Sequence, residues 1–334
     1  MKFSHLEQCL DDLVSQNAVE NAFVRVGIGD RILCDAARGP VNAETRFDMA
    51  SVTKIMATTS LALRAMDRGM LSPDTTADEF FPCNRTITVR NMLTHTIGFG
   101  HKSLNIEGNT YDNIAEYILN IAPDTPTGTR VHYCCPAFIL LGKILERIYG
   151  MRLDRAFSEY VAKPLGLTDT TFLPTDKTNM VASNPSPDET GMVNDYNCRF
   201  LGGVAGNAGL FSNAADVTKY VRCLLNGGEP LFSERTLALA AKNQTEGLNE
   251  ARGLGFVYVD GRDPQTAALF PVGSIGHCGH TGQSVFLDLK SKFFVVILSD
   301  AKNCVVKKYE HGHYEEVKEM RKRLHEAIKT DMEP

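Results

Sequence analysis

The chain has 334 residues, of which 43% are hydrophobic and 22% are charged, and its formal net charge at pH 7 is −5. This length accommodates one large domain or two intertwined ones, and the composition is typical of a soluble globular protein. The acidic balance argues against nucleic acid as a partner. The longest purely apolar stretch, 293–298, is far shorter than the ~20 residues of a membrane span.

The amino-terminal segment has the pattern of an amphipathic helix, with Ser4 and Glu7 at the spacing of a capping box. It lacks the apolar region of a secretory signal, so we expect no signal peptide. Nine cysteines form an odd set without C-x-x-C spacing, which favours a reducing compartment, the cytoplasm. The residues expected to face inward are Leu6, Leu10, Leu13 and Val14.

Two β-leaning runs follow, 21–29 and 32–37, and the turn residues between them predict a hairpin. Apolar residues at helical spacing then predict a helix over 51–68. From there to about residue 245, most periodic segments are helical.

Strand patterns return late in the chain, at 253–260, 285–289 and 293–299. The segment 315–329 has the pattern of a charged amphipathic helix. Strands at both ends around a helical middle predict an α+β fold of the α/β sandwich type. One antiparallel sheet is built from both termini and flanked by helices, with an all-helical domain inserted.

The same pattern predicts the domain boundaries. Residues 1–68 together with 246–334 should form the sheet domain, and residues 69–245 the inserted helical domain. We expect the active site in the cleft between them.

The strongest chemical signal is Ser51-Val52-Thr53-Lys54, at the predicted start of helix 51–68. Residues three apart share one helix face, so Lys54 can act as the base that a serine nucleophile needs if burial lowers its pKa. Backbone N–H groups of a first helical turn suit a developing oxyanion. The pattern is short, however, and recurs at Ser299–Lys302, where it follows a strand and no helix is expected behind it.

Tyr133 is a candidate for proton transfer, since it stands directly before a predicted helix. A phenol near Lys54 could be held as phenolate or could pass a proton to a leaving group. The alternative is a partly buried tyrosine that only forms a structural hydrogen bond.

The run Gly279-His280-Thr281-Gly282 precedes a predicted strand, and its glycines would let a substrate approach the strand edge. An ordinary glycine-rich strand entry is the alternative. A metal site at His277 and His280 is disfavoured, because no further ligands are obvious. We predict neither a metal nor a cofactor.

The glycine-rich run 202–210 should bring backbone near the cleft. It follows no clear strand and lacks G-x-G-x-x-G, which argues against a nucleotide-binding loop.

Ser51-Val-Thr-Lys54, Tyr133-Cys-Cys135 and His280-Thr-Gly282 occur in the order and approximate spacing of a known set of motifs. In these motifs the chain resembles the serine β-lactamase and penicillin-binding-protein superfamily, in particular its class C-like branch of family VIII esterases and D-aminopeptidases. The match covers roughly residues 20 to 300, and its supporting stretches are 46–51, 91–98, 202–206 and 208–212.

The resemblance implies roles for the matched residues. Ser51 would be acylated, Lys54 would be its base partner, and Tyr133 would transfer protons in acylation and deacylation. The backbone N–H groups of Ser51 and Gln283 would form the oxyanion hole.

On the substrate side, the resemblance implies that His280, Thr281 and Gly282 line the substrate edge together with Cys135. Two positions depart from the family pattern. Cys135 replaces an Asn whose amide helps hold the lysine and the substrate, and a thiol is a weak donor and acceptor. His280 replaces a Lys, and an uncharged histidine attracts a β-lactam carboxylate less strongly.

These features predict a serine hydrolase that cleaves a small ester or amide through an acyl-enzyme on Ser51. The alternatives are a true β-lactamase, or a non-catalytic binding protein that kept the cleft and lost competence at Cys135. The expected partner is a small-molecule substrate, with neither nucleic acid nor membrane involved. The physiological substrate and the oligomeric state are left open.

Overall fold

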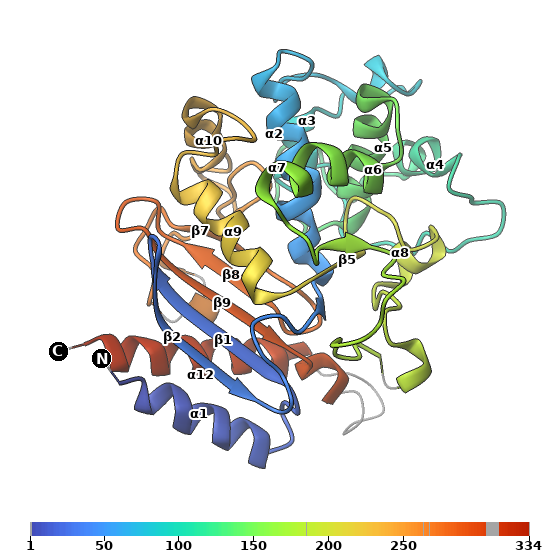
Figure 1. Cartoon of the computed structure of the whole chain (residues 1–334). Helices are drawn as coiled ribbons and strands as arrows, with labels where there is room; N and C mark the ends of the chain where they lie inside the picture. Colours follow the sequence, from blue (N-terminus) through green and yellow to red (C-terminus); the bar gives the residue numbers. More distant parts are fainter. Residues whose placement is uncertain (1, 185, 263, 267, 305–313, 334) are drawn as a thin grey trace.

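The computed structural model describes residues 2–184, 186–262, 264–266, 268–304 and 314–333 (Figure 1). Its main sheet has the strand order β2-β1-β9-β8-β7-β6, and every neighbouring pair is antiparallel. Strands from the two ends of the chain therefore lie side by side, as predicted. These strands are β1 (Ala22–Ile28), β2 (Arg31–Arg38), β6 (Val257–Tyr258), β7 (Ile275–Cys278), β8 (Ser284–Leu287) and β9 (Phe293–Ser299).

Helices cover both faces of this sheet. Helices α1 (Ser4–Ser15) and α12 (Tyr314–Met332) pack together on one face, and α9 (Ala214–Leu225) packs against β9 on the other (Figure 1). The apolar side chains form two buried clusters accordingly. The cluster around α1 and α12 includes Val24 and Ile297, which are paired across β1 and β9, whereas the larger cluster includes their chain neighbours Phe23 and Leu298. The sheet is thus buried on both faces.

The predicted helix 51–68 is present, but it consists of three different helical turns. A 3₁₀ turn (Ala50–Val52) leads into a π-helical segment (Lys54–Thr59), and α2 continues from Ser60 to Asp67. π-Helical segments are uncommon and are often found at functional sites. This one carries Lys54.

The remaining elements lie mainly between residues 47 and 240. A second sheet has the order β3-β5-β4. The elements are β3 (Phe47–Asp48), a 3₁₀ turn (Ala77–Glu79), α3 (Val89–Leu93), α4 (Ile114–Asn120), α5 (Cys135–Tyr149), α6 (Leu153–Phe157), a π-helical segment (Ser158–Ala162), α7 (Lys163–Leu165), β4 (Thr171–Phe172), a 3₁₀ turn (Pro187–Glu189), α8 (Tyr196–Phe200), β5 (Leu210–Ser212), α10 (Glu234–Ala240) and a 3₁₀ turn (Pro264–Thr266).

Some local expectations were wrong. Helix α1 begins after Phe3 without a side-chain cap, because Glu7 forms an ion pair with Arg38 at 2.7 Å instead of closing a capping box with Ser4. Val14 is 37% exposed, whereas the three predicted leucines of α1 are buried. The sequence pattern also missed strand β7.

The domain division at residues 68 and 245 stays a prediction. Helix α9 lies within the segment 69–245, yet it packs on the sheet. Among the described residues, no helix is both long and apolar enough to cross a membrane.

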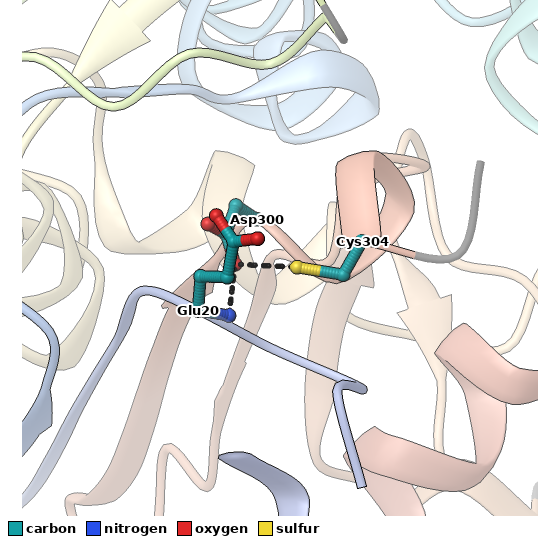
Figure 2. A group of neighbouring side chains, drawn as sticks. All are labelled: Glu20, Asp300 and Cys304. Carbon is teal, nitrogen blue, oxygen red and sulfur yellow. Dashed lines mark hydrogen bonds between the residues drawn. The ribbon is translucent and has the colours of Figure 1, made fainter. Parts of the chain in front are cut away.

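The second Ser-x-x-Lys copy lies at the end of β9. The Asp300 carboxylate accepts hydrogen bonds from the N–H groups of Glu20 and Asn21, each at 3.0 Å, from the Asn21 amide at 2.7 Å and from the Cys304 thiol at 3.5 Å (Figure 2). Contrary to expectation, a helical turn at 301–304 follows. Because four donors already occupy the carboxylate, this cluster joins the first and last strands and is not a convincing metal site, although the ligand atoms of Glu20, Asp300 and Cys304 lie within 4.8 Å of one another.

Candidate active site

Ser51 lies on a strained turn between β3 and the π-helical segment. The preceding residue, Ala50, has φ = +43°, a left-handed conformation that alanine rarely adopts. The Ala50 N–H donates to the Asp48 carboxylate at 2.8 Å, and the Asn194 N–H donates to the other oxygen of Asp48 at 2.7 Å. Ser51 itself is 8% exposed. These bonds fix the backbone that presents the Ser51 hydroxyl.

Lys54 is fully buried, and its ammonium group has three neighbours. Its Nζ atom lies 2.8 Å from Ser51 Oγ, 2.9 Å from the Asn207 carbonyl oxygen and 3.7 Å from Cys135 Sγ. The structure therefore brings Ser51, Lys54 and Cys135 together. The glycine-rich run 202–210 approaches this site through Asn207, in agreement with the sequence-based expectation.

Tyr133 approaches the same two residues from the segment before α5. Its hydroxyl hydrogen-bonds with Ser51 and Lys54, and Lys54 Nζ lies 5.1 Å from its ring centroid. Burial raises the pKa of Tyr133, while the Lys54 ammonium acts in the opposite direction. Tyr133 is 37% exposed as a whole residue, so one side of it is open to the cleft.

The proton affinity of Lys54 depends on its neighbours. Burial lowers the pKa of Lys54, but a thiolate at Cys135 or a phenolate at Tyr133 would raise it above its usual value. Burial raises the pKa of both Cys135 and Tyr133, so at neutral pH both are protonated and carry no charge. Burial is then the effect that remains, and it favours a neutral, basic Lys54 amine. Lys54 and Tyr133 titrate as a pair.

The segment Gly279–Gln283 is tied to the turn that carries Ser51. The Thr281 hydroxyl and the Gln283 amide both donate to the Asp48 carbonyl oxygen, at 2.9 and 2.5 Å. A Cβ atom on Gly279 would lie 2.8 Å from the Met49 carbonyl oxygen, so only glycine allows this approach. The two segments therefore form one rigid wall of the site.

His280 is exposed beside this wall. Partial burial of its ring lowers the pKa of His280, and the neighbouring Lys302 and Arg321 lower it further. At pH 7 the imidazole is therefore neutral, as the sequence suggested for this position.

A cavity of about 560 Å³ opens at Ser51. Ser51, Tyr133 and His280 line it, whereas Thr281, Gln283 and Cys135 are almost completely buried beside it and do not. The other lining residues are Asn249, Glu250, Ala251, Arg252, Val257, Tyr258, Asp260, Arg262, Gln265, His277, Cys278 and Lys318.

The sequence-based search missed several residues around Tyr133. The guanidinium of Arg252 lies 5.6 Å from the Tyr133 ring centroid and forms an ion pair with Glu250. The imidazoles of His95 and His277 lie 4.5 and 6.1 Å from the same ring. Only His95 belongs to a stretch that the resemblance had marked, 91–98. Arg252 and His277 have no local pattern that reveals them.

Comparison with known proteins identifies the family. A family model described as Beta-lactamase matches residues 6–310. The chain belongs to the Beta-lactamase family. This beta-lactamase family protein is accordingly an enzyme, a serine hydrolase that acts on ester or amide bonds.

Its relatives differ in their named activities. The chain is 28% identical to a protein of Escherichia coli K12 named "Putative D-alanyl-D-alanine carboxypeptidase", over 78% of this chain and 70% of that protein. Among solved structures it resembles EstCE1, a hydrolase with promiscuous acyltransferase activity, at a TM-score of 0.76 and 22% identity, over 96% of this chain and 98% of that one. It also resembles the simvastatin synthase LovD of Aspergillus terreus, at a TM-score of 0.75 and 18% identity, over 98% of both chains. These two likenesses show the fold alone.

Proposed function

We propose that this family member hydrolyses a small ester or amide through an acyl-enzyme on Ser51. The observation that carries the proposal is the 2.8 Å contact between Lys54 Nζ and Ser51 Oγ, formed by a fully buried lysine. A serine next to an uncharged amine has the base that a nucleophile needs.

In acylation, the Ser51 oxygen attacks the substrate carbonyl while its proton passes to Lys54 or Tyr133. The oxyanion that forms is stabilised by the backbone N–H groups of Ser51 and Gln283, each donor lowering the barrier by about 2.7–4 kcal/mol. Tyr133 then protonates the leaving group, since its hydroxyl hydrogen-bonds with both Ser51 and Lys54. In deacylation, the same pair takes a proton from the attacking water.

The substrate edge is His280, with Thr281 and Gln283 holding it in place. The neutral imidazole and the thiol of Cys135 favour an ester or a simple amide over a β-lactam with its carboxylate. The names of the E. coli relative and of EstCE1 agree with an amide and an ester, respectively. All nine cysteines are free, which supports our proposal that the enzyme works in the cytoplasm.

The test is turnover of three substrate types by the natural protein and by Ser51→Ala. We expect steady hydrolysis of p-nitrophenyl esters or D-amino-acid amides, abolished in Ser51→Ala. Continuous turnover of nitrocefin would instead identify a true β-lactamase. No turnover of any substrate, or turnover that survives Ser51→Ala, would contradict the proposal, and the first of these results would favour a non-catalytic binding protein.

A further inference from the structure

His95 contacts Tyr133 and is enclosed by the protein. Only 1% of His95 is exposed, and its ring centroid lies 4.5 Å from that of Tyr133, with the planes inclined by 37°. The ring of Phe138, in the first turn of α5, lies 5.0 Å from the same imidazole. His95 is therefore packed against both the tyrosine ring and the helix that follows it.

His95 also holds the main chain on both sides of Tyr133. The His132 N–H donates to the His95 carbonyl oxygen at 2.9 Å, and the Cys134 N–H donates to His95 Nδ1 at 3.0 Å. Residues 131–134 have no regular secondary structure. The two hydrogen bonds from His95 therefore take the place of the helix or sheet bonds that would otherwise orient Tyr133.

This arrangement has an energetic cost. Because Nδ1 accepts a hydrogen bond, the ring proton is on Nε2, which is buried and has no hydrogen-bond partner among the described residues. The backbone of His95 is left-handed, with φ = +58°. Burial, and then Arg252 and Lys54, lower the pKa of His95, so the ring stays neutral. An apolar ring would fill this space without the unpaired group, so packing alone does not explain the histidine.

We propose that His95 is a positioning residue that places the Tyr133 hydroxyl against Ser51 and Lys54. The inference rests on the proposed role of Tyr133 in proton transfer. Proton transfer by a positioned side chain contributes about 10²–10⁴-fold to a rate and is sensitive to small displacements. Loss of His95 should therefore lower kcat and leave KM nearly unchanged.

A double-mutant cycle with a p-nitrophenyl ester tests this coupling. His95→Phe keeps an aromatic ring but removes the acceptor for the Cys134 N–H, and it should lower kcat about ten- to hundredfold. His95→Asn keeps an acceptor and tolerates a positive φ, so it should retain more activity than His95→Phe. In a Tyr133→Phe background, His95→Phe should change kcat by less than about threefold.

The controls separate positioning from folding. His325 is an equally buried histidine in the other apolar cluster, so His325→Phe should leave kcat unchanged. Thermal unfolding of each variant shows whether it is folded, and His95→Asn carries the cycle if His95→Phe is not. An equal loss of kcat in both backgrounds, or no loss in either, would overturn the inference. If Tyr133→Phe alone leaves kcat unchanged, it is the proposed role of Tyr133 that fails.

Discussion

Lys54 Nζ lies 2.8 Å from Ser51 Oγ, and the lysine side chain has no exposed surface. Its other two partners are a carbonyl oxygen of Asn207 and the thiol of Cys135. None of these three groups is charged while the thiol and hydroxyl hold their protons. A lysine in such surroundings gives up its proton more readily than one paired with a carboxylate. Its burial is therefore explained by catalysis better than by stability.

Replacing Lys54 with methionine should separate these two properties. Lys54→Met removes a buried amine and keeps the volume, so the free energy of unfolding should stay equal or rise. We expect kcat to fall at least about 10³-fold, because the base is lost. Ester turnover and urea unfolding check the two effects, with the exposed Lys242→Met as the matched control. Near-normal turnover, or a stability loss above about 2 kcal/mol, would contradict this account.

Cys135 should matter little for the rate. Its Sγ atom lies 3.7 Å from Lys54 Nζ, whereas the Asn207 carbonyl oxygen lies at 2.9 Å and is the stronger acceptor. Cys135→Ala should therefore change kcat by less than about threefold and cost roughly 1 kcal/mol of stability. Ester kinetics and chemical unfolding measure both. A loss of kcat above about thirtyfold would show that the thiol itself is needed.

Gly206 should be indispensable to the position of Asn207. A Cβ atom at Gly206 would lie 2.0 Å from the Phe138 carbonyl oxygen of α5, so Gly206→Ala must push the glycine-rich run away from that helix. The Asn207 carbonyl would then leave Lys54, and we expect kcat to fall at least about tenfold at a temperature where the variant is folded. Gly202→Ala is the matched control. Its φ is +80°, but nothing lies within 4 Å of the added Cβ, so it should cost only about 1 kcal/mol and leave kcat unchanged. Equal kinetics for the two variants would refute this role of the run.

Acid should destabilise the fold through buried histidines. Burial lowers the pKa of His325 from 6.5 to about 4, so between these values the unfolded chain binds more protons than the folded one. This contribution to stability is complete above about pH 6.5 and is lost as the pH falls toward 4, amounting to about 2–3 kcal/mol at pH 4.5. Urea unfolding at pH 7 and 4.5 should show a smaller acid loss for His325→Phe than for the natural protein. An identical loss would mean that His325 does not contribute.

Part of this molecule is legible in the sequence because the signals are local. The hairpin of β1 and β2 and the apolar face of α12 follow from periodicity, and Ser51 with Lys54 follows from helical spacing. The 3₁₀ and π-helical turns that carry these two residues are not legible, since tertiary bonds from Asp48 and Asn207 impose them.

The residues that the sequence missed depend on long-range contacts. Arg252 and His277 reach Tyr133 only because the late strands lie beside the segment that precedes α5. Strand β7 was missed because its four residues, Ile275–Cys278, include a glycine and a histidine and are buried on both faces, so no alternation marks them. The capping box at Ser4 failed because Arg38, distant in sequence, competes for Glu7.

The central claim is that Ser51 becomes covalently acylated, and intact-protein mass spectrometry tests it most directly. After treatment with an activated phosphonate ester, the natural protein should gain the mass of one phosphonyl group, located by peptide mapping on the peptide that contains Ser51. Ser51→Ala should gain none, whereas Ser299→Ala should be labelled like the natural protein. A natural protein whose mass never shifts, or an adduct that persists in Ser51→Ala, would contradict the account.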